Sequence, residues 1–468
     1  TRSWGGTPLA DDRGVDDAGW DSSHWDTNTT GGDAGAIMFT GSNIKVYNVT
    51  FTNCTAVSRG GAVFLQDNKN VTFDLCVFEN NVALGIGNNT WNDDKNASSP
   101  KNPFLSGSGG AIGFDTGATL GVIKNSKFIN NTAQRLGGAI SFAKGSSNAT
   151  VINSTFDNNT AKRNGGAISV DGVNARFENC NFTNNSATAE DVDRTVFPLD
   201  SLSQIKCAYN VADLPDPSQS TNLLYVVIEY NATTNKNETY TMYVVSNGKW
   251  RSMKSTTETG PSYVDWAMDE YFCGDGGTIL WRGDNGTVDH CRFIDSNSAR
   301  RGGGAYMCGS DNITFQHSYF ENCTSGTNGG GVDWLAGANY GKVINCTFNN
   351  TRAARSAGAI YYDGDYGQMI NITVINATSY GGSLKQSKDG RVKYAGWDSS
   401  HWDTNTTGGD AGAIMFTGSH EYIYNATFIN CTATGRGGAV FLQDNENVTF
   451  ELCISRSEER RVGKECRS

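Results

Sequence analysis

The chain has 468 residues, a formal net charge of −11, 56 glycines and 7 prolines. An acidic balance without a Lys/Arg run argues against nucleic acid and against an anionic membrane surface as partners. No stretch of about 18 apolar residues is present, so the sequence predicts no membrane-spanning helix. The sequence starts at Thr1 within a repeat, which leaves a signal peptide further upstream open.

A repeat of about 28 residues organises the sequence. It is clearest over residues 137–159, where Gly-Gly-Ala-Ile is followed a dozen residues later by Phe-Asp-Asn-Asn. Ala111, Ala139 and Ala167 hold equivalent positions at intervals of 28 residues. Self-similarity at such a period predicts a solenoid, in which each repeat buries its apolar face against its neighbours.

Apolar and polar residues alternate within each repeat, as in residues 139–143 and 151–156. Alternation at a period of two predicts β-strands. The density of Gly, Asn, Ser, Thr and Val argues against helices. We therefore expect a rod of about eleven stacked coils, each built from short strands.

Several columns of residues recur at fixed positions of the coil. Paired glycines suit a corner with positive φ or close backbone approach, and the Asn pair suits a second corner, where stacked amides can hydrogen-bond from coil to coil. The Phe two residues before the Asn pair is expected to stack on the Phe of the next coil. A column of small residues two positions before that Phe is expected to face inward, its free thiols acting as small hydrophobes: Cys76, Ser126, Ser154, Cys180, Cys291, Ser318 and Cys346.

In chain order, residues 1–189 are predicted to hold a polar, Trp-rich loop at 1–32 and then coils from Gly35 onward. A loop rich in Gly and Asn interrupts these coils within residues 82–108.

Residues 190–275 break the repeat. Two β-prone segments, 223–230 and 239–245, and an Asn247-Gly248 turn predict a small inserted antiparallel β subdomain. Cys207 and Cys273 bracket it and could form a disulfide in an oxidising compartment.

Coils resume over residues 276–455, with a third interruption between Ala377 and Ala411, where residues 381–384 are either a degenerate coil or part of a loop. Residues 395–454 repeat residues 18–77 with a few substitutions, which indicates a tandem super-repeat. Residues 456–468 resemble a translated sequencing adapter and are excluded from the fold prediction.

The three excursions all leave a coil after the Asn corner and return before the Gly corner. We therefore expect them to project from one edge of the rod, and insertions in a solenoid often mark its binding face.

This architecture resembles the right-handed parallel β-helix, the pectin-lyase-like solenoid of pectate lyases and of many surface virulence factors. The paired Gly-Gly-Ala-Ile and Phe-x-x-Asn motifs are more closely similar to the polymorphic outer-membrane protein repeats of chlamydiae and to adhesin-like surface proteins of gut methanogenic archaea. The resemblance covers most of the chain. It implies an all-β fold and an extracellular, cell-surface protein.

Asn-x-Ser/Thr sequons are frequent and would suit a secreted glycoprotein. The repeat itself requires Asn corners followed by Thr or Ser, so the sequons have a structural explanation as well. They include Asn48, Asn130, Asn148, Asn158, Asn184, Asn231, Asn349 and Asn425.

An enzymatic function is an alternative, because this fold also hosts polysaccharide lyases and hydrolases. Glycoside hydrolysis requires two carboxylates about 5–10 Å apart. The candidate acids do not recur in phase with a His or Arg partner, and the motifs of polygalacturonase-like enzymes and of pectate lyases are absent. We predict no catalytic residue among these acids, which are Asp284, Asp311, Asp333, Asp363 and Asp365.

Metal ligands are not evident from the spacing of residues. The five histidines, His24, His290, His317, His401 and His420, form no recognisable ligand set. The twelve cysteines lack C-x-x-C spacing, which argues against zinc. Calcium near Asp21, Asp26 and Asp33 is a weaker alternative without the Gly-Gly-x-Gly-x-Asp repeat of calcium β-rolls. No cofactor and no metal site are predicted.

Binding of other molecules is therefore the function that we favour. Exposed aromatic side chains suit sugar stacking, although the tryptophans of the excursions could instead fold back as lids on the rod. We predict a non-enzymatic adhesin-like protein that binds host, microbial or glycan surfaces, with a polysaccharide lyase or hydrolase as the first alternative and an inert stalk as the second. The candidate contact residues are Trp20, Trp25, Trp91, Trp250, Trp397 and Trp402.

Overall fold

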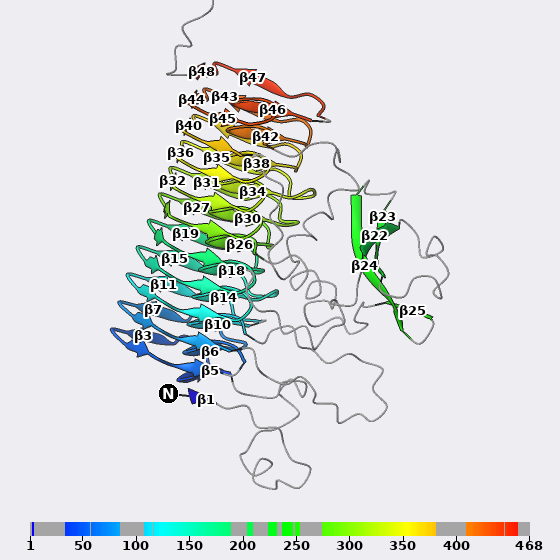
Figure 1. The fold of residues 1–468 in the computed structure, drawn as a ribbon. Helices are drawn as coiled ribbons and strands as arrows, with labels where there is room; N and C mark the ends of the chain where they lie inside the picture. Colours follow the sequence, from blue (N-terminus) through cyan, green and yellow to red (C-terminus); the bar gives the residue numbers. More distant parts are fainter. Residues whose placement is uncertain are drawn as a thin grey trace, which may run out of the picture.

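The structure of the protein is a computed structural model that describes residues 33–56, 58–84, 107–115, 117–188, 274–380, 409–443 and 445–456. It also describes the backbone of the strands at residues 2–3, 204–208, 223–231, 236–246 and 249–252. All regular elements within these residues are β-strands. All of them except β22 to β25 stack into a rod whose chain colours run in order from one end to the other (Figure 1).

The rod consists of four parallel sheets of eleven strands, and each coil contributes one strand to each sheet. Sheet B contains β2 (Ile37–Phe39), β6 (Val63–Leu65), β10 (Ile112–Phe114), β14 (Ile140–Phe142), β18 (Ile168–Val170), β26 (Ile279–Trp281), β30 (Ala305–Met307), β34 (Val332–Trp334), β38 (Ile360–Tyr362), β42 (Ile414–Phe416) and β46 (Val440–Leu442). Sheet C follows with β3 (Lys45–Tyr47), β7 (Thr72–Asp74), β11 (Val122–Lys124), β15 (Thr150–Ile152), β19 (Arg176–Glu178), β27 (Thr287–Asp289), β31 (Thr314–Gln316), β35 (Lys342–Ile344), β39 (Gln368–Ile370), β43 (Tyr422–Tyr424) and β47 (Thr449–Glu451).

The other two sheets complete each coil. Sheet D contains β4 (Thr50–Thr52), β8 (Val77–Glu79), β12 (Lys127–Ile129), β16 (Thr155–Asp157), β20 (Asn181–Thr183), β28 (Arg292–Ile294), β32 (Tyr319–Glu321), β36 (Thr347–Asn349), β40 (Thr373–Ile375), β44 (Thr427–Ile429) and β48 (Ile454–Arg456). Sheet A contains β1 (Arg2–Ser3), β5 (Thr55–Ala56), β9 (Val82–Ala83), β13 (Thr132–Ala133), β17 (Thr160–Ala161), β21 (Ser186–Ala187), β29 (Asn297–Ser298), β33 (Thr324–Ser325), β37 (Arg352–Ala353), β41 (Thr378–Ser379) and β45 (Thr432–Ala433).

Equivalent residues of successive repeats pair with each other, for example Ile112 with Ile140 and Phe128 with Phe156. The predicted stack of Phe side chains is confirmed: ring centroids in neighbouring coils of sheet D lie 4.5 to 4.9 Å apart. This distance equals the spacing of paired strands. The predicted inward column of small residues is buried as well, and its cysteines are free thiols.

The two glycines of the Gly corner have separate roles. Gly137 has a φ of 64°, whereas a Cβ on Gly138 would lie 2.1 Å from the carbonyl oxygen of Gly166 in the next coil. The first position therefore requires a left-handed backbone and the second requires close backbone approach.

Ala357 occupies the first position of this corner and has a φ of 60°. A left-handed conformation costs an L-residue about 1 to 2 kcal/mol, and glycine loses about 0.5 to 1 kcal/mol of unfolded-state entropy. We expect Ala357→Gly to change the free energy of unfolding by less than about 1 kcal/mol, because relief of the left-handed conformation offsets the loss of a buried methyl group that packs with Tyr361 and Met415. The urea midpoint measures this, with Ala359→Gly in the same buried coil as the control that should lose stability. Equal losses in both variants would contradict the argument.

The two asparagines of the Asn corner also differ. Asn158 is exposed at a φ of 55°, and its side chain donates to Asn130 of the preceding coil. Asn159 is fully buried, and its Oδ1 accepts from both the backbone N–H and the Nδ2 of Asn131 at 3.0 and 2.9 Å. The predicted amide ladder is therefore confirmed at both positions, outside and inside the rod.

The excursions leave and return at one position of the coil. Leu84, Thr188 and Tyr380 each donate their N–H to the equivalent carbonyl of the preceding coil before an excursion. Gly107, Gly274 and Gly409 re-enter before the Gly corner. Because β1 belongs to sheet A and β2 to sheet B, residues 4–32 form a fourth excursion at this position, the A–B edge.

The inserted subdomain is present, but it is not purely antiparallel as predicted. Its strands are β22 (Gln204–Ala208), β23 (Leu223–Asn231), β24 (Lys236–Ser246) and β25 (Lys249–Ser252). β23 and β24 pair antiparallel, as do β24 and β25, whereas β22 pairs parallel to β23. The sheet is mixed because β22, which the prediction did not include, adds to β23 in the parallel direction.

Candidate functional site

The outer face of sheet B is defined by the middle residues of its strands, because the flanking residues of each strand belong to the core. This face lies beside the A–B edge. The middle residues are largely buried. From β6 to β42 they are Phe64, Gly113, Ser141, Ser169, Leu280, Tyr306, Asp333, Tyr361 and Met415.

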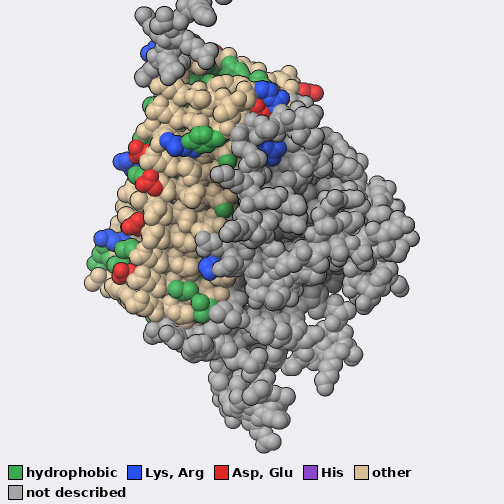
Figure 2. All heavy atoms as spheres, in the orientation of Figure 1, with side chains coloured by type: hydrophobic (Ala, Val, Ile, Leu, Met, Phe, Trp, Pro, Cys, Tyr) green, Lys and Arg blue, Asp and Glu red, His purple; other side chains and the backbone are tan. Residues whose placement is uncertain are grey.

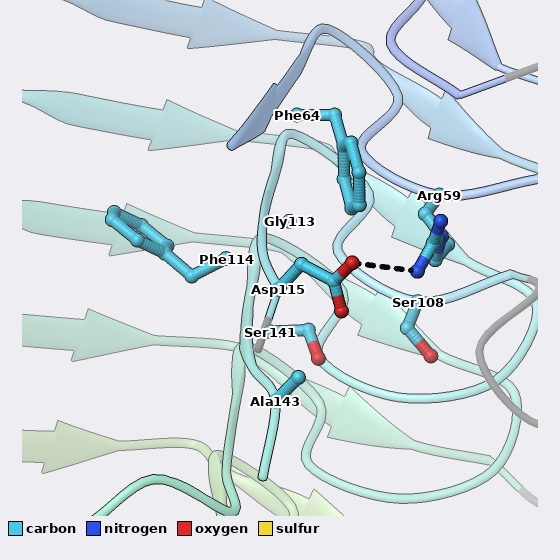
Figure 3. A pocket seen from close by; sticks show the side chains of 8 residues that line it. All are labelled: Arg59, Phe64, Ser108, Gly113, Phe114, Asp115, Ser141 and Ala143. Atoms are coloured by element: carbon cyan, nitrogen blue, oxygen red, sulfur yellow. Dashed lines mark hydrogen bonds and ion pairs between the residues drawn. The ribbon is translucent and has the colours of Figure 1, made fainter. Parts of the chain in front are cut away.

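Ion pairs between coils border this face. Arg59 contacts Asp33 at 2.8 Å and Asp115 at 3.2 Å, and it lies over the ring of Phe64 (Figure 3). Arg436 repeats the arrangement with Asp410 at 2.7 Å and with Phe441, as the tandem super-repeat predicts. Two further ion pairs between coils border the same face, Arg282 with Asp171 and Arg300 with Asp275. These acids are neutralised within the rod.

A small cavity lies where Gly113 leaves a gap between Phe64 and Ser141 (Figure 3). Its volume of about 10 Å³ is barely enough for one water molecule. It is therefore too small for a sugar or a peptide side chain.

Asp333 is the acid among these middle residues. It pairs in register between Tyr306 and Tyr361, its side chain is fully buried, and neither carboxyl oxygen accepts a hydrogen bond from the described residues. Burial raises the pKa of Asp333 to about 7, although the nearby Arg301 lowers it. Burial also raises the pKa of both flanking tyrosines well above its usual range.

The other candidate acids have structural roles. Asp284, Asp311 and Asp365 each accept a backbone N–H of the next coil at 2.9 Å. Asp363 accepts the hydroxyl of Thr417 at 2.6 Å. They continue the coil-to-coil hydrogen bonds of the corners, as expected for acids at solenoid turns.

The structure brings together three residues that sequence reasoning did not connect. His290 and His317 occupy the same corner of neighbouring coils, and both Nδ1 atoms lie within hydrogen-bond distance of Asp289 Oδ1, at 2.7 and 3.0 Å. The signal was present, because the two histidines stand 27 residues apart at a corner where most other coils carry Asn. Burial raises the pKa of Asp289, but hydrogen bonds from His317, Gln316 and His290 outweigh it and leave the pKa below its usual value.

A row of exposed rings follows another corner. Tyr340 stacks on Tyr366 at 5.1 Å, and Tyr366 stacks on His420 at 4.8 Å. The rings cover one another's faces, so mainly their edges meet solvent. A sugar that stacks on an aromatic face would find little free face along this row.

The side chains of all six predicted contact tryptophans lie outside the described part of the structure. Trp20, Trp25, Trp91, Trp397 and Trp402 are not described, and Trp250 is described only as backbone of β25. Cys207 is described only as backbone of β22, and Cys273 is not described, so the disulfide stays a prediction. Residues 381–384 also lie outside the described part.

On the rod face visible in Figure 2, charged and apolar side chains of the described residues are scattered singly among polar groups and backbone. They form no continuous patch on that face. Within the described part of the chain, no helix is long and apolar enough to cross a membrane.

Comparison with protein-family models supports the architecture. Residues 21–195 match a family described as "Right handed beta helix region". The crystal structure of PfbA, a surface adhesin of Streptococcus pneumoniae, aligns with a TM-score of 0.36 and 11% identity over 88% of this chain and 84% of PfbA. No functional statement follows from a likeness at this level. No curated protein matches.

The fold is an all-β, right-handed parallel β-helix, as the sequence predicted. The finer resemblance to polymorphic outer-membrane repeats and to archaeal adhesin-like proteins stays a prediction.

Proposed function

We propose that the protein is a non-enzymatic, adhesin-like component of a cell surface. In this proposal the four excursions at the A–B edge bind glycans or proteins on host cells or on other microbes. The protein acts outside the cell, and the coils serve as a rod that displays the excursions.

The observation that carries the proposal is the shared position of the excursions. The described residues before and after each one hold equivalent places in the coil, so four separate segments start from one edge of the rod. Regular coils elsewhere need no insertion between sheets A and B, as β13 and β14 show. Insertions confined to one edge are typical of solenoids that bind through that edge.

A single assay separates binding from catalysis. The purified full chain is incubated with a panel of soluble polysaccharides and with whole microbes, and both retention and new reducing or unsaturated ends are followed. We expect retention on some members of the panel without new ends. New ends would contradict the non-enzymatic proposal, and absence of retention throughout would favour an inert stalk.

Asp333 favours a second candidate function, a polysaccharide lyase or hydrolase. A carboxyl with a pKa near 7 can act as general acid or base at neutral pH, but Asp333 is fully buried here, so this candidate also requires an opening of the face that lets substrate reach it. Asp363 on the next coil would supply a second carboxyl, which glycoside hydrolysis requires. If the assay detects new ends, this candidate requires that Asp333→Asn abolish their release while retention persists.

A further inference from the structure

Asp289, His290 and His317 form a compact cluster at the corner between sheets C and D. One ligand atom from each residue lies within 4.8 Å of the other two. The Asp289 side chain is 12% exposed, whereas those of His290 and His317 are 58% and 41% exposed. An ion could therefore reach the imidazoles from solvent while the carboxylate is held against the rod.

The backbone fixes this geometry. His290 and His317 both adopt left-handed conformations, with φ of 51° and 48°, at the corner where neighbouring coils carry Asn179 and Asn345. Their rings stack with centroids 4.6 Å apart. Because Asp289 is the last residue of β27, directly before this corner, its carboxylate lies beside both rings.

The donor atoms suit a transition-metal ion. Two imidazole nitrogens and one carboxylate oxygen are common ligands of Zn²⁺, which binds them at about 2.0 to 2.2 Å. Tetrahedral ligands at that distance lie roughly 3.3 Å apart. The Nδ1 to Oδ1 distances of 2.7 and 3.0 Å are slightly shorter, so a small rotation of the exposed rings would admit an ion.

A neighbouring amide would support the cluster. Asn345 Nδ2 lies 3.1 Å from His317 Nε2, so in the metal-free protein the amide donates to this nitrogen and His317 carries its proton on Nδ1. Metal binding at Nδ1 displaces that proton, and the Nε2–H that then forms needs an acceptor. Rotation of the Asn345 amide would present its oxygen, as the outer partners of metal-bound histidines commonly do. The rotation would exchange this contact for the exposed hydrogen bond that the Asn345 oxygen accepts from Asn371 Nδ2 at 3.0 Å.

We propose that Asp289, His290 and His317 bind one divalent first-row transition-metal ion, Zn²⁺ in the first place, on the outer surface of the rod. Three protein ligands leave at least one coordination position for water or for a ligand from another molecule. The site lies away from the A–B edge, so it is separate from the proposed binding function. Within the described residues, no other cluster of His, Cys, Asp and Glu meets the same criterion.

The variant His290→Asn/His317→Asn tests the site. It installs the residue that Asn179 and Asn345 provide in the neighbouring coils, so the corner should keep its fold. The matched control is His420→Asn, at an exposed corner where other coils also carry Asn and where the cluster is absent. The full chain, without a histidine tag and stripped with a chelator, is titrated with Zn²⁺ by calorimetry and with Co²⁺ by visible absorption.

We expect one ion per chain at this site and a loss of at least about 100-fold in affinity in the double variant. Loss of outer partners alone costs about 10- to 100-fold, and here two direct ligands are removed. His420→Asn should bind as the wild type does. Absence of Zn²⁺ and Co²⁺ binding, unchanged binding in the double variant, or equal loss in His420→Asn would each overturn the site. Circular dichroism of the metal-free variants establishes that the coils are intact.

Discussion

Asn159→Ala is expected to lower the free energy of unfolding by about 3 kcal/mol or more, while Asn158→Ala next to it costs about 1 kcal/mol. Asn159 Oδ1 accepts two hydrogen bonds from Asn131, and Asn159 Nδ2 donates to the Phe128 carbonyl and to Asn185 Oδ1. Truncation leaves several buried polar groups unsatisfied, each costing about 1 to 3 kcal/mol. Asn158 loses two exposed hydrogen bonds, one donated to Asn130 and one accepted from Asn184, together with its tolerance of positive φ.

Urea denaturation of the two variants measures the difference. Hydrogen exchange of the Asn131 amide adds a local measurement, because solenoids can open one region at a time. That amide should lose protection in Asn159→Ala and keep it in Asn158→Ala. Equal destabilisation by the two substitutions would show that the inner amide ladder contributes no more than an ordinary corner residue.

Asp333→Asn is expected to remove a large pH dependence of stability. The pKa of Asp333 is raised in the folded chain from 3.8 to about 7, so the folded state binds the proton more tightly than the unfolded state. The stabilising contribution of the protonated carboxyl is complete below about pH 4 and is lost as the pH rises through about 7. At pH 8 the loss approaches about 4 kcal/mol as an upper bound.

Thermal unfolding at pH 5 and at pH 8 tests this prediction. Asn is neutral at both values, so Asp333→Asn should raise Tm clearly more at pH 8 than at pH 5, where only the first part of the loss has occurred. Asp284→Asn, at an exposed corner, is the matched carboxyl-to-amide control. If Asp333→Asn shifts Tm by the same amount at both pH values, then the carboxyl is not held neutral by its surroundings.

The fold was predictable because the same sequence pattern recurs in every coil. The Phe stack, the small inward column and the Gly corner each recur at a fixed interval, so one repeat determines the others. The separate roles of Asn158 and Asn159 were not distinguished, because both positions read as Asn and only the register shows which one faces the core. The parallel pairing of β22 required a long-range contact that local alternation does not encode.

The candidate sites were less predictable for the same reason. Asp333 is set between Tyr306 and Tyr361, and its burial depends on coils of 27 and 28 residues coming into register. His290 and His317 were considered as separate histidines, and a comparison by corner position would have paired them. Insertions change the number of residues between coils. Position within the coil therefore predicts which residues of different coils lie side by side better than their separation along the chain does.

Deletion of single excursions tests the central proposal most directly. Thr188 and Gly274 hold the places that Lys162 and Arg163 occupy in an uninterrupted coil, so removal of residues 189–273 joins them within a regular coil. Removal of 85–106 or of 381–408 gives comparable variants. On surfaces that retain the full chain, we expect at least one deletion to abolish retention while the β-rich circular dichroism spectrum persists. Undiminished retention by all three variants would contradict the proposal that the excursions bind.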